Sequence, residues 1–362
     1  MYPGDAAIRY NFGTLLMRNH RPEEAIEQFR EVVRVDPRHA SAFVNLATSY
    51  RELGRPEQAI PYYEKAFEVE PGLLDTVTVV HEYSFGLVHV GKLAQAKAVL
   101  ATAAAKPGME ASMLRSLALV DMVEGRYAEA RARLEESVLL SATHNDPVRL
   151  ARGHVFMAIL LRGSGDRLGE IRELERAAHE LTPKIPAWLR CRVAAYFALA
   201  GAVDRAERLA RELSSQVDRR NLPDASSLHL LEGELALARG NLPRALELLS
   251  LADRESSTPE TLAGLADAYR RAGDRAKAIS YYEKLIGEAS AALGWEAQQS
   301  WIEAHASLAE LYLSGNENAK AAATLGALER LWANADKGLP LTRKAAQLRR
   351  QLQSADGPAQ PI

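Results

Sequence analysis

The clearest structural unit of this chain lies at residues 41–71, which read SAFVNLATSYRELGRPEQAIPYYEKAFEVEP. Apolar residues recur at helical spacing on both sides of Gly54, and the second stripe ends in aromatic and small residues. A similar segment, ETLAGLADAYRRAGDRAKAISYYEKLI, occupies residues 260–286. Each segment predicts a helix, a glycine turn and a second helix, and their recurrence predicts a repeat architecture.

The unit at residues 41–71 resembles the tetratricopeptide repeat, a helix–turn–helix module of about 34 residues. The residues that carry the resemblance are Phe43, Leu46, Ala47, Tyr50, Ala59, Tyr63, Ala66 and Pro71. In such a module, small residues let the two helices approach closely, and larger residues fill the space to the next module. The resemblance implies an all-α fold, an α-solenoid that winds as a right-handed superhelix.

A turn glycine marks the register of the repeats. It occurs at Gly54, Gly91, Gly125, Gly165, Gly201, Gly240 and Gly273. An alanine follows five residues after each of these glycines except at Glu170. The turn before this series carries Asn19-His20, and the turn after it carries Gly315-Asn316. The register therefore predicts about nine repeats.

The repeats predict one domain over residues 5–353, whereas a length of 362 residues alone would suggest two or three. Residues 341–353, LTRKAAQLRRQLQ, form an amphipathic pattern that predicts a helix capping the last repeat. The tail at 354–362 lacks apolar content and is expected to be disordered. Residues 289–300 exceed the repeat length and predict a longer loop or an extended helix. Contacts are expected to run mainly between neighbouring repeats.

The composition argues against several classes of protein. The single cysteine, Cys191, rules out an internal disulfide and a cysteine-based zinc site, and it fits a cytoplasmic protein. With 45 basic and 47 acidic residues, the net charge of −2 favours neither nucleic acid nor anionic lipid as a partner. The apolar runs are far shorter than the ~20 residues that cross a bilayer, so no membrane insertion is expected. The first ten residues lack the pattern of a signal peptide.

The chain also lacks the usual signatures of catalysis. GSGDRLG at 163–169 has the wrong spacing for a dinucleotide-binding loop and predicts a turn between helices. His81-Glu82 begins like a zinc-protease motif, but Phe85 stands where the second histidine would be. Cys191 is expected to be an inert, buried thiol. We therefore expect a protein that is not an enzyme and that holds no cofactor or metal.

The resemblance implies that the first helices of the repeats line a concave groove. Asn11 and Asn45 occupy equivalent groove positions in the first two repeats, and an asparagine there can pair with the backbone of an extended peptide. The alternative is that these asparagines are ordinary residues of a helix surface and bind nothing. A chaperone-type carboxylate clamp is not intact, because Tyr10 and Thr14 stand where it needs lysine and asparagine.

The middle of this groove combines arginine with large apolar side chains, which are enriched at binding hot spots. The residues placed there are His81, Phe85, Arg115, Met122, Arg152, Phe156, Arg162, Trp188 and Arg192. This set predicts a partner peptide or helix that carries acidic and apolar residues. The alternative is an ordinary solvated face with a few exposed apolar side chains. Trp295 and Trp301 are expected to pack against a helix rather than to bind a partner.

The sequence thus predicts a non-catalytic scaffold that binds a partner polypeptide in its concave groove. An alternative function is the regulatory or sensor region of a larger bacterial signalling protein. It is suggested by residues 327–345, ALERLWANADKGLPLTRKA, which resemble the end of repeat regions fused to signalling kinases and cyclases. The sequence gives no indication of the partner's identity or of the oligomeric state.

Overall fold

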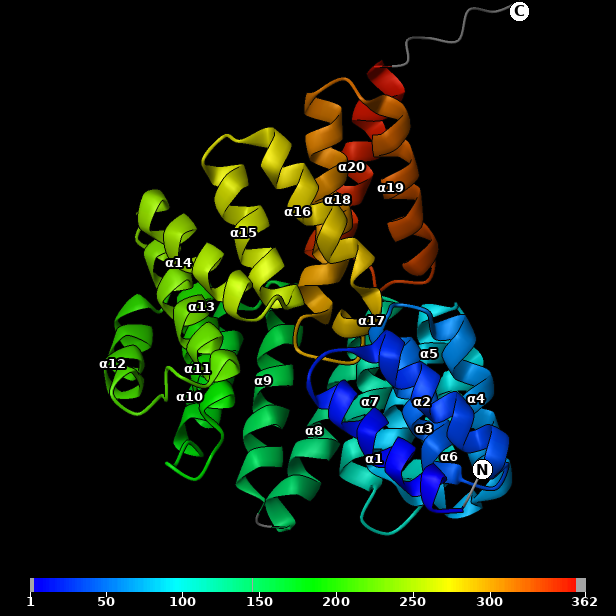
Figure 1. The fold of residues 1–362 in the computed structure, drawn as a ribbon. Helices are drawn as coiled ribbons and strands as arrows, with labels where there is room; N and C mark the ends of the chain where they lie inside the picture. The colour runs from blue at the N-terminus through cyan, green and yellow to red at the C-terminus, as the bar shows by residue number, and fades with distance from the viewer. Residues whose placement is uncertain (1–2, 145, 356–362) are drawn as a thin grey trace, which may run out of the picture. The chain divides into compact units, whose positions relative to one another are not determined.

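The computed structural model describes residues 3–144 and 146–355, which fold almost entirely into α-helices (Figure 1). The helices are α1 (Pro3–Arg18), α2 (Pro22–Val35), α3 (Ala40–Glu52), α4 (Pro56–Val69), the 3-10 helix η1 (Pro71–Asp75), α5 (Val77–His89), α6 (Leu93–Ala104), α7 (Glu110–Val123), α8 (Tyr127–Thr143), α9 (Pro147–Ser164), α10 (Arg167–His179), α11 (Ala187–Leu199), α12 (Val203–Ser214), α13 (Leu222–Ala238), α14 (Leu242–Glu255), α15 (Pro259–Arg271), α16 (Arg275–Gly287), α17 (Ala289–Ala292), α18 (Gln298–Ser314), α19 (Asn318–Leu331) and α20 (Pro340–Ala355). The described residues contain no strand, and none of their helices is long and apolar enough to span a membrane.

These helices follow one another as helix–turn–helix pairs, which confirms the predicted α-solenoid. The first helices of the pairs are α1, α3, α5, α7, α9, α11, α13, α15 and α18, and the helix after each is its second helix. The described residues therefore form nine pairs, the number that the glycine register predicts, and α20 follows the last pair.

The turns within the pairs share one backbone feature, a residue in the left-handed region. All seven glycines of the predicted register have φ between +66° and +86°. Glycine has no Cβ, so it adopts this conformation without strain and ends the first helix. Where the register lacks the glycine, His20 and Asn316 take its place with φ of 54° and 59°. The sequence pattern thus located all nine turns.

The alanines that follow the turn glycines are buried at the contact between the helices of a pair. Their small side chains allow the close helix approach that the repeat requires. The exception in the register, Glu170, is also buried, with 1% of its surface exposed. Arg167 Nη1 lies 2.9 Å from Glu170 Oε2, so an ion pair replaces the apolar contact at this turn.

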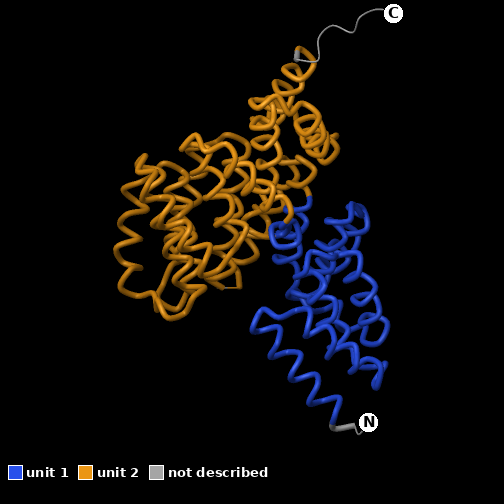
Figure 2. The backbone as a smooth tube through the Cα atoms, turned by 45° about the horizontal axis from the view of Figure 1, so that its top comes forward, with its two compact units in different colours: residues 1–120, 288–294 blue, residues 121–287, 295–362 orange. Residues whose placement is uncertain are grey.

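The chain divides into two compact units, coloured separately in Figure 2. Unit 1 contains residues 1–120 and 288–294, and unit 2 contains residues 121–287 and 295–362. Unit 1 thus includes α17, a short helix that comes from late in the sequence and packs on α3 and α5. The one-domain organisation expected from the repeats stays a prediction.

Contacts run mainly between neighbouring helices, as expected, and the two ends of unit 2 also contact each other. Helices α18 and α20 both pack on α9. Asp336, between α19 and α20, donates its backbone N–H to the carbonyl of Gly125 at 3.0 Å. Its carboxylate accepts the backbone N–H of Ala128 in the first turn of α8 at 2.8 Å. The Trp332 ring meets the Tyr127 ring edge-on, with centroids 5.8 Å apart.

Helix α20 covers the last repeat, as the amphipathic pattern at 341–353 predicts. It packs on α18 and α19, with Leu341, Leu348 and Leu352 buried. Arg349 forms an ion pair with Glu329 of α19 at the edge of this contact. The helix continues to Ala355, so the first two residues of the expected disordered tail are helical. The rest of that tail, at 356–362, lies outside the described residues.

Candidate protein-binding surface

The first helices α9, α11, α13, α15 and α18 of unit 2 line one cavity of about 300 Å³, to which Tyr282 and Leu285 of the second helix α16 also contribute. Its apolar lining comes from small and aliphatic side chains such as Ala195, Leu199, Leu230 and Ala263. The charged lining residues are Arg162, Arg192, Glu234, Glu260, Asp267, Arg270, Arg271 and Glu303. This mixture of an apolar wall with a few convergent polar groups is typical of ligand sites in proteins.

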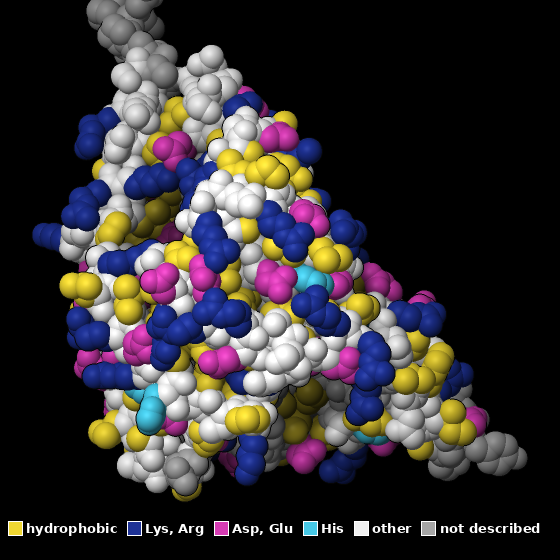
Figure 3. All heavy atoms as spheres, turned by 90° about the vertical axis from the view of Figure 1, so that its left-hand side faces the viewer, with side chains coloured by type: hydrophobic (Ala, Val, Ile, Leu, Met, Phe, Trp, Pro, Cys, Tyr) yellow, Lys and Arg dark blue, Asp and Glu magenta, His cyan; other side chains and the backbone are white. Residues whose placement is uncertain are grey.

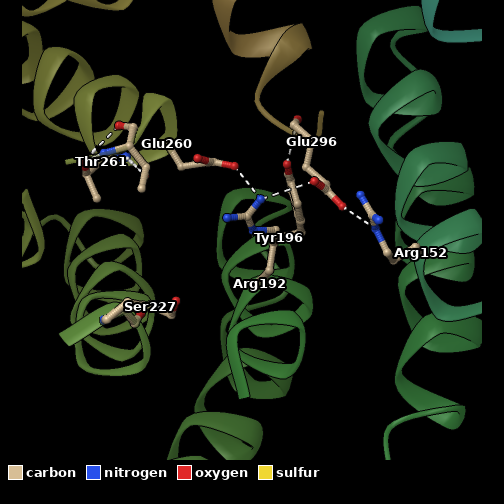
Figure 4. Close-up of polar contacts among 9 residues, drawn as sticks. Arg152, Arg192, Tyr196, Ser227, Glu260, Thr261 and Glu296 are labelled. Carbon is tan, nitrogen blue, oxygen red and sulfur yellow. Dashed lines mark hydrogen bonds and ion pairs between the residues drawn. The ribbon is translucent and has the colours of Figure 1, made fainter. Parts of the chain in front are cut away.

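Next to this cavity, Glu296 is held between two arginines (Figure 4). Arg152 Nε from α9 lies 2.9 Å from Glu296 Oε1, and Arg192 Nη1 from α11 lies 3.4 Å from Oε2. Arg192 also pairs with Glu260 of α15 at 2.5 Å. The Tyr196 hydroxyl donates to the backbone carbonyl of Glu296 at 3.0 Å. Glu296, two residues before the start of α18, is therefore bound through both its side chain and its backbone.

Aromatic rings surround the two arginines. The Arg152 guanidinium lies 5.5–5.8 Å from the ring centroids of Phe156, Trp188 and Trp295, and Arg192 lies 5.6 Å from Trp188. Such cation–π contacts strengthen when they are desolvated. Burial by itself would raise the pKa of Glu296, but Arg152 and Arg192 outweigh it, and the pKa lies below its ordinary value. Glu296 is thus a buried, ionised carboxylate.

A second set of contacts holds the start of α18. The Tyr127 hydroxyl donates to the Gln299 side chain, whose Nε2 donates to Glu303 at 2.8 Å. Arg162 lies 3.7 Å from Glu303. Together with Glu296, these residues place the stretch from Trp295 to Glu303 against the first helices of unit 2.

The structure brings together four of the residues predicted for the middle of the groove, namely Arg152, Phe156, Trp188 and Arg192. The two arginines are not open to a partner, because Glu296 of the same chain pairs with both and the Trp295 ring contacts Arg152. Phe156 is 1% exposed, which corrects the expectation of an accessible ring. Arg162, which lies further along α9, also faces a carboxylate of this chain, that of Glu303.

Met122 was predicted to line the groove as well, and it is fully buried at the end of α7. The prediction for this residue is wrong because residues 116–123 of α7 are all buried, so this part of the helix exposes no face.

The other predicted groove residues belong to unit 1. Phe85 is 5% exposed because Gly294 lies on its ring, so close that a Cβ at Gly294 would sit 2.6 Å from it. His81 is buried and its Nδ1 lies 2.9 Å from Ser116 Oγ. The expectation that Phe85 and His81 face a partner is therefore wrong. Asn11 is exposed on α1, and Asn45 and Arg115 are half-buried on α3 and α7.

The segment at residues 288–294 is bound within unit 1 through polar contacts too. His89 Nδ1 lies 2.8 Å from Ser290 Oγ, and Arg51 Nη1 donates to the Ser290 carbonyl at 3.3 Å. Arg51 also lies 3.5 Å from Glu82, which accepts the Tyr63 hydroxyl at 2.8 Å. The first helices of both units thus hold parts of the extra residues that precede α18.

Sequence reasoning missed Glu234, Glu260 and Glu296 as site residues. For Glu296 a signal was present, since residues 289–300 exceed the repeat length and contain one acidic residue that complements the predicted arginines. Two expectations about single residues, Trp301 and Cys191, hold. Trp301 packs with its Nε1 donating to the Ile286 carbonyl at 3.0 Å. Cys191 is buried, and burial raises the pKa of its thiol to about 12, as expected for an inert cysteine. The described residues contain no cluster of potential metal ligands.

Comparison with known proteins agrees with this architecture. Family models described as tetratricopeptide repeat match residues 10–69, 200–260 and 261–293. These parts of the chain are tetratricopeptide repeats, modules that serve as scaffolds for protein–protein interaction. No curated protein sequence matches it significantly.

Several solved structures are similar to parts of the chain. One is a tetratricopeptide repeat protein from Parabacteroides merdae, with 18% identity, 70% of this chain and 94% of that chain covered, and a TM-score of 0.47. Another is pilF of Pseudomonas aeruginosa, with 18% identity, 68% and 97% covered, and a TM-score of 0.42. A third is MamA from Desulfovibrio magneticus, with 16% identity, 49% and 94% covered, and a TM-score of 0.40.

Proposed function

We propose that the protein is a non-catalytic scaffold that binds a partner polypeptide along the first helices of unit 2. The observation that carries this proposal is that α9 and α11 already bind a polypeptide segment, Trp295 and Glu296 of the same chain, which lie before α18. That segment is acidic and aromatic, as the arginine-rich face predicts for a partner.

The unfilled part of this face is the cavity between α9, α11, α13, α15 and α18. It continues directly from the bound segment, because Arg192 and Tyr196 both contact Glu296 and line the cavity. Arginine and tyrosine are the residue types that dominate binding energy at protein interfaces. A partner that enters the cavity would therefore contact Arg192 and Tyr196, two side chains that Glu296 already holds in place.

The absence of catalysis and of a cofactor is part of the same proposal. The raised pKa of the Cys191 thiol, to about 12, disfavours its use as a nucleophile. The arginines of the cavity are paired with carboxylates, so they are not preorganised for a phosphate group. Protein interaction accounts for all of these features.

The class of partner and the compartment are proposed on charge and composition. Basic and acidic side chains are interspersed over the face drawn in Figure 3, which suits a protein partner better than a nucleic acid. The single, buried cysteine suits the cytoplasm. The alternative, a regulatory region of a larger signalling protein, stays a prediction that no feature of the described residues favours.

Partner capture with matched variants tests this function. Ala263 lines the cavity and is half-buried, so Ala263→Phe should fill the cavity without entering the core. Ala276 is exposed on α16, the second helix of the same repeat, and Ala276→Phe is the control. Polypeptides retained from native lysate by wild type and by Ala276→Phe, but lost with Ala263→Phe, should bind purified wild-type protein directly. Identical retention by all three folded proteins would overturn the proposal.

A further inference from the structure

The cavity of unit 2 contains one carboxyl group that the fold leaves unpaired. Glu234 on α13 lines the cavity and is 6% exposed. It forms neither a hydrogen bond nor an ion pair with any residue that the structure describes. Burying a carboxylate without a partner is costly, so this group needs an explanation.

The other charged residues of the cavity are all paired. Arg192 lies 2.5 Å from Glu260, and Arg162 lies 3.7 Å from Glu303. The remaining two arginines share one carboxylate: Asp267 accepts from Arg270 at 2.5 Å and from Arg271 at 2.7 Å. The four arginines are thus paired with Glu260, Glu303 and Asp267 and with Glu296 beside the cavity, and Glu234 is the carboxyl group left without a partner.

The carboxyl group of Glu234 lies directly against a glycine, which leaves no room for a side chain there. Gly264 of α15 faces it, and a Cβ added there would sit 2.7 Å from Glu234 Oε1. Any side chain at this position would therefore displace the carboxyl group. The glycine brings no side-chain donor of its own, so a hydrogen-bond donor must come through the cavity.

We propose that this cavity is a binding site for an alkylammonium group, with Glu234 as its counter-ion. The ammonium group has three donors and one positive charge, which the carboxylate of Glu234 can accept. Leu199, Leu230 and Ala263 supply the apolar wall that the alkyl stem of such a ligand needs. An anion fits the cavity less well, because its arginines are already neutralised.

The electrostatics of the site agree with a missing cation. Burial, followed by the nearby carboxylate of Asp267, raises the pKa of Glu234 to about 7, while Arg162 and Arg271 act against the shift. A bound ammonium group would stabilise the ionised form and reverse the shift. Below about pH 7, Glu234 is protonated, so binding should release its proton. Above that pH the group is already ionised, so binding should release no proton.

The ammonium group could belong to a lysine of the bound partner or to a free amine. The lysine form rests on the proposed function and deepens it, because the cavity is the unfilled part of the proposed polypeptide-binding face. The free-amine form does not depend on that function, so the two sources must be separated by the probes.

The test is calorimetric titration of the full chain at pH 8 and low salt with three probes. They are the peptide acetyl-Ala-Ala-Lys-Ala-Ala-amide, the same peptide with norleucine in place of lysine, and n-butylammonium chloride. The lysine peptide should bind wild type at least tenfold more tightly than the norleucine peptide, since norleucine keeps the four-carbon stem and lacks the ammonium group. Comparable or tighter binding of n-butylammonium would assign the site to a free amine.

Two variants complete the design. Glu234→Gln keeps the size of the side chain and should lose at least tenfold in affinity for the ammonium probes. Glu247→Gln, on the exposed face of α14, is the matched control and should bind like wild type. Circular dichroism spectra should show that both variants remain folded. Equal affinity of wild type and Glu234→Gln, or no ammonium binding at all, would overturn the inference. Loss of partner capture with Ala263→Phe would still support the scaffold in that case.

Discussion

At the scale of single residues, two buried glutamates of unit 2 have pKa values shifted in opposite directions. Glu296 is clamped by Arg152 and Arg192, and these arginines keep its pKa below the ordinary value. Glu234 has no such partner, and its pKa rises to about 7. Removing one member of a buried ion pair leaves an unpaired charge and costs several kcal/mol. Substituting Arg152 or Arg192 would therefore test folding as much as binding.

Glu234→Gln should change how the stability of unit 2 depends on pH. The raised pKa means that the folded protein binds a proton which the unfolded chain has lost above about pH 4.5. Wild-type stability should therefore fall as pH rises from 5 to 8, by at most about 3 kcal/mol for this group. Glutamine does not titrate, so the melting temperature of Glu234→Gln relative to wild type should increase over that range. A difference that is constant from pH 5 to pH 8 would contradict the assignment.

At the scale of elements, the turns were readable from sequence because each depends on a local requirement. A residue in the left-handed region ends the first helix, and glycine meets that requirement without strain. Register, helix pairing and the cap α20 all follow from such local patterns. The burial of Phe85 does not, because Gly294, from far along the chain, covers its ring. No repeat pattern specifies where an insertion between repeats will lie.

Gly54→Ala should destabilise the protein by about 1 kcal/mol, the order of the cost of a left-handed alanine. The Cβ at Gly54 would meet no atom within 4 Å, so the loss would come from the backbone, where φ is +66°. Gly72 is the matched control, since it too has open space around it and lacks a positive φ. Chemical denaturation of both variants measures the difference. Equal effects at the two positions would contradict the role given to the turn.

At the scale of the whole molecule, each compact unit includes residues that are distant in sequence. Unit 1 holds residues 288–294 against α3 and α5, and the end of unit 2 packs on its beginning. Such contacts are unusual for a solenoid, whose stability normally comes from neighbouring repeats. They explain why the sequence predicted the α-solenoid and its repeats correctly. They also explain why some residues predicted to line an open groove are buried.

The contact between the ends of unit 2 predicts a long-range helix cap. Asp336 accepts the N–H of Ala128, so it caps α8 from a distance of more than two hundred residues along the chain. Asp336→Ala should cost about 1 kcal/mol, a typical value for a lost cap. Asp336→Asn keeps an accepting oxygen and should lose less. Thermal melting of the two variants checks this, and no loss in Asp336→Ala would show that the contact contributes nothing.

The central claim is that the first helices of unit 2 bind a partner polypeptide. The most direct measurement is photo-crosslinking in native lysate, with benzoylphenylalanine placed at Ala263 in the cavity or at Ala276 on the second helix. The account predicts a covalent adduct with a second polypeptide from position 263 and none from position 276. Adducts from both positions alike, or from position 276 alone, would contradict it.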